Sequence, residues 1–233
     1  MGPQATVDFM AKLVSRTNAA RDQDHIRLIV DHNPTVPNRH EAIVGDRTEV
    51  SAALVDMARG LERAGADFLL MVCNTAHAFQ QDIKDAVGIP FVGIVEEVVS
   101  ELDSKWSDSR RVGVMAADGC LASGLYQRAL REAGREPITW SDVELEQFMA
   151  LLYQVKAGDA LEKTRLRMEQ LAQSLIVRGA EVLIAGCTEI PLILHNSDAT
   201  SELPFPLLSS TDILVSRTID YAMGIKALPV LKE

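Results

Sequence analysis

Two cysteines follow apolar runs at comparable points in the two halves of the chain. Cys73 comes directly after residues 68–72, FLLMV, and Cys187 comes directly after residues 182–186, VLIAG. The polar residues that follow the two thiols are Asn74, Thr75, Thr188 and Glu189. Ligands of open α/β sheets bind at the carboxyl ends of the strands, so we expect both thiols to face one cleft.

Two facing thiols are suited to moving protons on and off a carbon atom. The thiolate is the reactive form of cysteine, with an ordinary pKa of about 8.5, and a helix N-terminus lowers that value. If one thiolate removes a proton from one face of a carbon and the other thiol returns a proton to the opposite face, the configuration is inverted. This chemistry needs no pyridoxal cofactor. Asn74, Thr75 and Thr188 would bind the substrate carboxylate and stabilise the developing enediolate.

A structural interpretation competes with the catalytic one. A single free cysteine is more often a buried core residue than a reactive one, but two matched cysteines followed by polar residues favour catalysis. Cys73 and His77 would also lie on one face of a helix and so could bind a metal. A zinc site usually needs four closely spaced ligands, so we expect no metal and assign His77 a packing or supporting role.

The composition places the chain among ordinary soluble globular proteins. Of its 233 residues 47% are hydrophobic and 24% are charged, and the net charge is -10. This charge argues against nucleic acid and against an anionic membrane as partners. The sequence shows no signal peptide and no apolar run long enough to span a membrane. Its three cysteines fit no disulfide framework, which indicates the cytoplasm.

Strands and helices alternate along the chain in two similar series. The predicted strands are residues 26–30, 68–72, 90–94, 111–115, 137–140 and 182–186. The predicted helices are residues 4–19, 46–64, 78–86, 95–102, 123–133, 142–155 and 161–178, with a last helix from about 209 to 223. Gly65 is expected to cap one helix end and Ser123 to cap a helix start. Residues 31–39 are expected to form a loop, 103–110 a linker, and 204–208 only a short apolar stretch.

This alternation predicts an α/β fold with two lobes, each a mainly parallel sheet flanked by helices. We expect residues 1–102 and 209–233 to form the first lobe, and residues 103–208 the second. The active site is expected in the cleft between them.

The sequence resembles the cofactor-independent aspartate/glutamate racemase family, in particular its aspartate and broad-specificity amino-acid racemase branch. Residues 1–6, MGPQAT, match the MGPxAT motif of that branch, and residues 36–39, VPNR, resemble its IPDR loop. Residues 73–77, CNTAH, and 186–191, GCTEIP, correspond to the two catalytic motifs of the family. The resemblance covers essentially the whole chain, and the two cysteine motifs together are highly specific.

The resemblance implies a function and roles for individual residues. It implies a cofactor-independent racemase acting on an amino acid, most readily aspartate, with Cys73 and Cys187 as the two acid/base thiols. Arg39 and Lys156 would bind the side-chain carboxylate of an acidic substrate, and Glu189 would orient the Cys187 thiol or contact the substrate amine. The remaining residues expected at the substrate are Asn74, Thr75, Thr188, Met1 and Thr6. A homodimer is the assembly that the family implies.

The sequence departs from the family pattern at two places. A first strand and a Gly-Gly pair, which precede the MGP motif in the family, are absent here, so we expect the first lobe to be without that strand. Residues 115–120, MAADGC, replace the LATxGT loop that lines the cleft in the family. Ala117 and Cys120 thus replace two threonines, and Cys120 is expected to be a bystander.

Three functions remain open at this point. The first is the amino-acid racemase, which the thiol pair, Arg39, Lys156 and the GCTE motif favour. The second is a related enzyme that uses the thiols differently, such as a hydantoin racemase, a maleate isomerase or an arylmalonate decarboxylase. The third is a small-molecule binding protein without catalysis, which exchange of the substrate α-hydrogen with solvent deuterium would distinguish from both enzymes.

Overall fold

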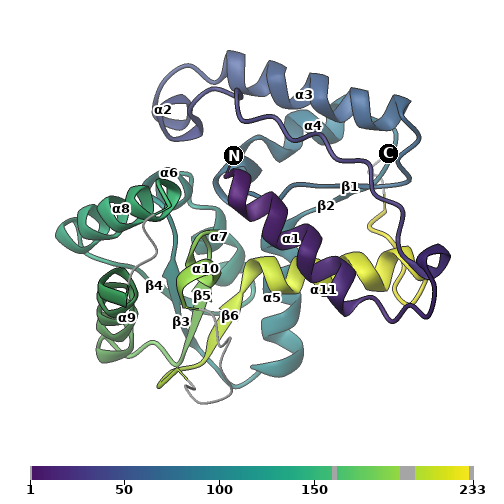
Figure 1. Cartoon of the computed structure of the whole chain (residues 1–233). Coiled ribbons are helices and arrows are strands. Elements are labelled where there is room, and N and C mark those ends of the chain that lie inside the picture. Colours follow the sequence, from purple (N-terminus) through teal and green to yellow (C-terminus); the bar gives the residue numbers. More distant parts are fainter. Residues whose placement is uncertain (1, 159–161, 195–202, 231–233) are drawn as a thin grey trace.

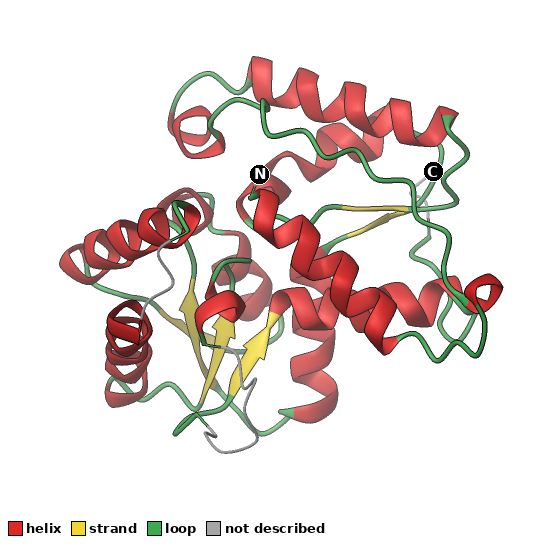
Figure 2. Ribbon diagram, in the orientation of Figure 1, coloured by secondary structure: helices red, strands yellow, loops and turns green. Residues whose placement is uncertain are grey.

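The computed structural model describes residues 2–158, 162–194 and 203–230, which form two parallel sheets with helices between and around them (Figures 1 and 2). Three clusters of buried side chains separate the layers. The resulting order is helices, first sheet, helices, second sheet and helices. The predicted α/β class with parallel, helix-flanked sheets is confirmed.

The second sheet has four parallel strands in the order β4-β3-β5-β6. Their bounds are β3 Arg111–Met115, β4 Glu136–Ile138, β5 Val182–Ala185 and β6 Leu207–Ser209. Alternate residues of β3 and β5 point to opposite faces, so Ile184 joins the cluster on one side and Leu183 the cluster on the other. Both faces are covered, which explains why these strands are continuous apolar runs in the sequence.

The first sheet pairs two short parallel strands in the described residues, β1 Leu69–Leu70 and β2 Phe91–Val92. Its outer face is covered by α3 Thr48–Arg63 and α4 Gln80–Ala86, through a cluster that includes Leu54. Residues 26–30, predicted as a strand, form no ladder with either strand. The apolar residues are present there, but a strand also requires a hydrogen-bonded neighbour.

One layer of helices lies between the two sheets (Figure 1). Its members are α1 Pro3–Arg16, α5 Ile94–Lys105, α7 Leu125–Glu132 and α11 Ser210–Ala222. They share a single buried cluster with the inner faces of both sheets. The two lobes therefore share a core, and α11 returns to pack on α1 and α5. On this basis we propose to retain the division into residues 1–102 with 209–233, and 103–208.

The remaining helices surround the strand ends and the outer face of the second sheet. They are α2 Arg39–Val44, α6 Asp118–Ala122, α8 Asp142–Lys156, α9 Glu162–Val177 and α10 Ile190–Ile193, with short 3-10 helices at Asp22–Asp24 and Thr75–Phe79. Leu161, the predicted start of α9, lies outside the described residues. No helix of the described chain combines the length and apolarity needed to cross a membrane.

Several predicted boundaries needed correction. The helix α2 was not predicted, because the expected loop ended at residue 39 and residues 40–45 were assigned to no element. Asn38 caps this helix by accepting a hydrogen bond from the His40 N–H at 3.0 Å. Ser123 does not start α7. Gly124 does so, with a φ of 66° that favours glycine. Gly65 ends α3 as predicted, with a φ of 89°.

Candidate active site

Both cysteines line one small pocket at the carboxyl ends of the strands. Cys73 follows β1 and Cys187 follows β5, while Ala117 comes from the loop after β3. The other lining residues are Gly2, Arg39, His40, Asn74, Thr75, Leu152, Lys156, Thr188 and Glu189. The cavity measures about 20 Å³, which is room for about one water molecule. A ligand larger than a water molecule therefore requires the pocket to widen before it can bind.

The thiol of Cys187 is held by the carboxylate of Glu189. Its Sγ donates a hydrogen bond to Glu189 Oε2 at 3.1 Å, and Thr188 Oγ1 donates to the same oxygen at 3.1 Å. Lys156 Nζ lies 3.2 Å from the other oxygen, Oε1. Glu189 is thereby satisfied by a cation, a hydroxyl and a thiol although it is buried.

The electrostatics of this cluster keep Cys187 protonated. Burial raises the pKa of the Cys187 thiol well above its usual value, and the charge of Glu189 adds to this. The expectation that a helix N-terminus would lower this pKa is therefore wrong for Cys187. Burial acts to raise the pKa of Glu189, but Lys156 and the hydrogen bonds from its neighbours lower it overall. Burial acts to lower the pKa of Lys156, but Glu189 raises it overall. The pocket thus combines an ion pair with a neutral thiol.

Cys73 is half-buried, and its backbone is fixed by His77. His77 Nδ1 lies 2.8 Å from the carbonyl oxygen of Cys73, and its Nε2 accepts a hydrogen bond from the Ile94 N–H at 3.0 Å. The ring is therefore neutral with its proton on Nδ1, and burial lowers the pKa of His77 to about 4. Both ring nitrogens are engaged by the backbone, so His77 cannot bind a metal together with Cys73.

Asn74 is positioned by a buried chain of hydrogen bonds that joins the two lobes. Tyr126 Oη donates to Asn74 Oδ1 at 2.6 Å, and Asn74 Nδ2 donates to Ser210 Oγ at 3.0 Å. Ser210 in turn donates to the carbonyl oxygen of Ala185 at 2.7 Å. The chain thus links the segment after Cys73 to the end of β5, directly before Gly186 and Cys187.

Arg39 and His40 face the pocket from the start of α2. Arg39 Nη1 donates to the carbonyl oxygens of Val36 and Pro37, both at 2.9 Å, and its buried Nε has no hydrogen-bond partner among the described residues. Arg39 lines the pocket, and within the described residues its guanidinium hydrogen-bonds through Nη1 alone. His40 Nδ1 lies 2.5 Å from Asp118 Oδ1 in α6, which places a polar contact across the cleft.

The matches to known proteins agree with this geometry. Residues 1–218 match the Asp/Glu/Hydantoin racemase family. The chain belongs to this family. The broad specificity amino-acid racemase RacX of Bacillus subtilis is 27% identical over 223 residues, covering 94% of this chain and 93% of that protein. The predicted enzyme class, an isomerase of the Asp/Glu racemase type, is confirmed.

Solved structures of racemases share the fold. The aspartate racemase of Picrophilus torridus has a TM-score of 0.81 and 27% identity, covering 98% of this chain and 92% of that one. The glutamate racemase of Francisella tularensis, solved in complex with D-glutamate, has a TM-score of 0.57 and 17% identity over 82% of this chain and 70% of that one. At this low identity, the similarity to the Francisella tularensis enzyme shows a shared fold.

The pocket of the two cysteines gathers most of the residues singled out from the sequence. Those that line it are Arg39, Cys73, Asn74, Thr75, Lys156, Cys187, Thr188 and Glu189. Thr6 lies instead in the wall of a larger cavity, and Met1 lies outside the described residues. Cys120 is fully buried in the shared core, where burial raises its pKa to about 12. Among the described residues there is no group of His, Cys, Asp and Glu side chains arranged to hold a metal.

Several residues at the pocket of the two cysteines had no assignment from the sequence. His40 lines it directly, and its position after Arg39 in the VPNR loop was the available signal. Tyr126 and Ser210 hold the pocket residue Asn74 by hydrogen bonds. Asn74 lies far from both of them in the sequence, so no local sequence pattern marks Tyr126 or Ser210.

Proposed function

We propose that the chain is a cofactor-independent racemase of acidic amino acids, with aspartate as the preferred substrate, acting through Cys73 and Cys187. The observation that carries the proposal is that both thiols line one pocket in different environments. Cys187 is a buried thiol hydrogen-bonded to a carboxylate, whereas Cys73 is half-buried. Cys187 is thereby marked as the thiol that donates a proton first.

In the proposed reaction the thiolate of Cys73 removes the α-proton from one face of the substrate. The electron pair of the broken C–H bond moves into the carboxylate, which becomes an enediolate. The thiol of Cys187 then gives its proton to the opposite face, which forms the new C–H bond and leaves the Cys187 thiolate. The reverse reaction exchanges the two roles. Donors to the carboxylate must stabilise the developing charge, since the α-carbon is a weak acid.

The charged groups of the pocket favour a dicarboxylic amino acid. Arg39 has an unused donor and can form a bidentate contact with a carboxylate. Glu189 neutralises much of the charge of Lys156 at 3.2 Å, so Arg39 is the stronger candidate for the side-chain carboxylate. Glu189 could also accept a hydrogen bond from the substrate ammonium group. The RacX relative, described as having broad specificity, makes other amino acids necessary controls.

The test is incubation with L-aspartate in D2O without added cofactor, with D-aspartate and α-deuterium measured together. We expect racemisation with solvent deuterium in the product, and its loss in Cys73→Ala and in Cys187→Ala. Cys120→Ala is the matched control, because it removes a thiol that does not line the pocket. No exchange with aspartate, glutamate or other amino acids would contradict the proposal. Equal losses in all three variants would contradict the assignment of the two thiols.

Arg39→Lys tests the substrate class separately from the chemistry. It retains the positive charge but removes the planar fork that suits a carboxylate. We expect KM for aspartate to rise about tenfold or more, while KM for an amino acid with an uncharged side chain is affected less.

The homodimer stays a prediction, which sedimentation equilibrium tests.

A further inference from the structure

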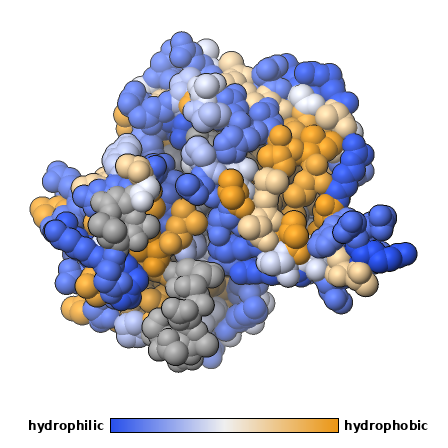
Figure 3. All heavy atoms as spheres, in the orientation of Figure 1, coloured by the Kyte–Doolittle hydropathy of each residue, from blue (hydrophilic) through white to orange (hydrophobic). Residues whose placement is uncertain are grey.

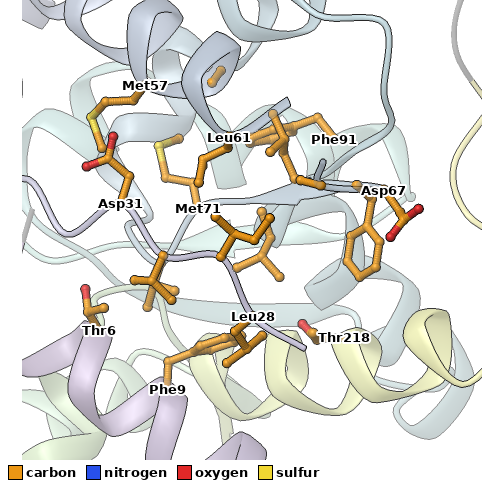
Figure 4. Close-up of a pocket in the computed structure, with 18 of the residues that line it drawn as sticks. Thr6, Phe9, Leu28, Asp31, Met57, Leu61, Asp67, Met71, Phe91 and Thr218 are labelled. Carbon is orange, nitrogen blue, oxygen red and sulfur yellow. The ribbon is translucent and has the colours of Figure 1, made fainter. Parts of the chain in front are cut away.

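The larger cavity and the pocket of the two cysteines are separate spaces. The larger cavity measures about 250 Å³, and most of its wall is apolar, with Phe9, Leu28, Leu61 and Phe91 among the side chains labelled in Figure 4. A hydrophobic patch gathers to the right of centre in Figure 3, over the area where α1, residues 26–31 and β1 lie in Figure 1. No described residue lines both cavities. The group that prepares a thiol for proton transfer must therefore come from the smaller pocket itself.

The pocket of the two cysteines needs a base, because the proposed reaction starts from a thiolate at Cys73. Its titratable side chains in the described chain are Arg39, His40, Cys73, Lys156, Cys187 and Glu189. Arginine remains protonated in proteins. Lys156 and Glu189 form an ion pair at 3.2 Å, and Glu189 also accepts a hydrogen bond from the Cys187 thiol. His40 is therefore the side chain of this set that is suited to accept the proton of Cys73.

Asp118 determines which nitrogen of His40 can accept a proton. Its Oδ1 lies 2.5 Å from Nδ1 of His40 and 2.6 Å from the backbone nitrogen of Gly119. A carboxylate oxygen at this distance requires a proton on Nδ1, so the lone pair of the neutral ring is on Nε2. The Gly119 N–H lies farther from Nδ1, at 3.3 Å, and donates to the carboxylate instead. Both contacts of the ring are thus made at Nδ1, and in the described chain Nε2 makes no hydrogen bond.

The His40 ring lies between Asp118 and the pocket of the two cysteines. His40 lines this pocket and Asp118 does not, so Nε2 is the nitrogen available to the pocket. α2 also packs against the 3-10 helix that begins at Thr75. A Cβ atom at Gly119 would lie 2.9 Å from His40 Nδ1 and 3.2 Å from Thr75 Cγ2, so His40 and the segment directly after Cys73 flank the same point. The pocket of about 20 Å³ has room for about one water molecule, which can carry a proton between two groups.

The charge state of His40 suits a base at neutral pH. Burial lowers the pKa of His40 below its usual value, Asp118 opposes this, and Lys156 and Arg39 add to the lowering. The ring is therefore neutral at pH 7, and its lone pair can accept a proton. Glu189 lies 3.2 Å from Lys156 and balances its charge. Once the thiol proton has moved, the thiolate and the imidazolium carry opposite charges in one pocket, and each stabilises the other.

We propose that His40, held by Asp118, is the general base that takes the proton of the Cys73 thiol at Nε2, directly or through one water molecule. This role rests on the proposed function, in which the Cys73 thiolate removes the α-proton. The S–H bond of Cys73 breaks, its electron pair stays on the sulfur, and the proton forms an N–H bond at Nε2. After Cys73 has taken the α-proton and Cys187 has given its own, the imidazolium passes its proton to the Cys187 thiolate. Both thiols and the neutral imidazole are thereby restored.

The rate at which iodoacetamide alkylates Cys73 tests this role without any substrate. It is measured against pH in a Cys120→Ala, Cys187→Ser background, where Cys73 is the remaining thiol. His40→Asn keeps a donor to Asp118 at the position of Nδ1 but has no titrating base. We expect His40→Asn to slow alkylation at pH 7 about tenfold, because less thiolate is present. At about pH 10, where an ordinary thiol ionises unaided, the two rates should converge.

Asp118→Ala is the second variant, and it changes the tautomer of His40 while keeping the imidazole. The Gly119 N–H, 3.3 Å from Nδ1, becomes the nearest donor, so the ring proton moves to Nε2 and alkylation at pH 7 should slow as well. His32→Asn makes the change of His40→Asn at an exposed histidine and should leave the profile unchanged. Unchanged alkylation in His40→Asn would overturn the proposal. A loss of equal size at every pH would also overturn it, because it would show a steric effect.

Racemisation of aspartate separates this proposal from the proposed function. In the chain with all three thiols, His40→Asn should lower kcat on the order of 100-fold with KM less affected, and the acidic limb of the pH profile should move to higher pH. An undiminished kcat in His40→Asn would overturn the role of His40. A wild-type chain that does not racemise amino acids would contradict the proposed function alone, since the alkylation test needs no substrate.

Discussion

The thiol of Cys187 donates a hydrogen bond of 3.1 Å to the carboxylate of Glu189. The contact has two consequences for proton transfer. It orients the sulfur, and it places a negative charge beside the thiol, which adds to burial in raising the pKa of Cys187. Lys156 opposes this by lowering the pKa of Cys187, but Glu189 and burial outweigh it.

Replacing Glu189 by glutamine removes the charge and keeps the shape. We expect the pKa of Cys187 to fall in Glu189→Gln, because the adjacent anion is gone, while burial still raises the pKa and Lys156 still lowers it. The acid form of the thiol is then lost at lower pH, so the alkaline limb of the profile of kcat/KM against pH should move to lower pH. Activity at neutral pH should fall about tenfold, because a neutral amide orients the Cys187 thiol less strongly than the carboxylate does.

The thiolate is measured by its ultraviolet absorbance during titration, in a Cys73→Ala, Cys120→Ala background where Cys187 is the remaining thiol. Glu132→Gln is the matched control, since it makes the same chemical change at an exposed position on α7. A titration curve that does not move in Glu189→Gln would show that Glu189 does not set the protonation of Cys187.

The hydroxyl of Tyr126 is predicted to stabilise the fold through Asn74. Burial raises the pKa of Tyr126 well above its usual value, so the hydroxyl remains a donor to Asn74 Oδ1 at 2.6 Å. Tyr126→Phe leaves that buried oxygen without a donor, which should lower the free energy of unfolding by about 1–3 kcal/mol. Urea unfolding measures the change. Tyr153→Phe, in an exposed residue of α8, is the control and should have no effect. Equal changes in the two variants would contradict the role of the buried chain.

His77 is predicted to make stability depend on pH. Its pKa is about 4 in the folded protein and 6.5 in its ordinary state, so the folded chain binds fewer protons than the unfolded chain between these values. The neutral ring of His77 contributes on the order of 3 kcal/mol to the free energy of unfolding. This contribution is fully present above pH 6.5 and is lost as the pH falls toward 4. His77→Gln should be less stable at pH 7 but lose less stability between pH 7 and 4.5. His32→Gln, a change of an exposed residue, should leave the slope of the free energy of unfolding against pH as in the wild type.

If this slope were also unchanged in His77→Gln, the result would contradict the burial of a neutral His77 ring.

The sequence predicted the elements that carry the thiols better than the contacts around them. Cys73 and Cys187 could be placed in one pocket because each follows an apolar run, and parallel strands end at the same edge of a sheet. The pairing of Lys156 with Glu189 was not predicted, because one sequence does not record which distant side chains meet. Residues 26–30 have the composition of a strand but form no ladder. A ladder requires a hydrogen-bonded neighbouring strand, which composition alone does not predict.

Gly119 lies in α6 where this helix packs against α2 beside the pocket. A Cβ atom there would lie 2.9 Å from His40 Nδ1 and 3.1 Å from His40 Cα. Because the second of these atoms belongs to the backbone of α2, the added methyl group must push α2 and α6 apart. The contact between His40 and Asp118 joins α2 to α6 at this point, and the pocket of about 20 Å³ is too small for an amino acid.

Gly119→Ala is therefore predicted to favour the open pocket. Alkylation of Cys73 by iodoacetamide should become several times faster, because the thiol is then more accessible. The value of kcat/KM should fall about tenfold, since closing the pocket excludes water and aligns the reacting groups. Gly60→Ala in α3 is the matched control: an added Cβ meets nothing closer than 4.0 Å there, so alkylation and activity should be unchanged. Slower alkylation of Cys73 in Gly119→Ala would show that the added methyl group tightens the pocket instead of opening it.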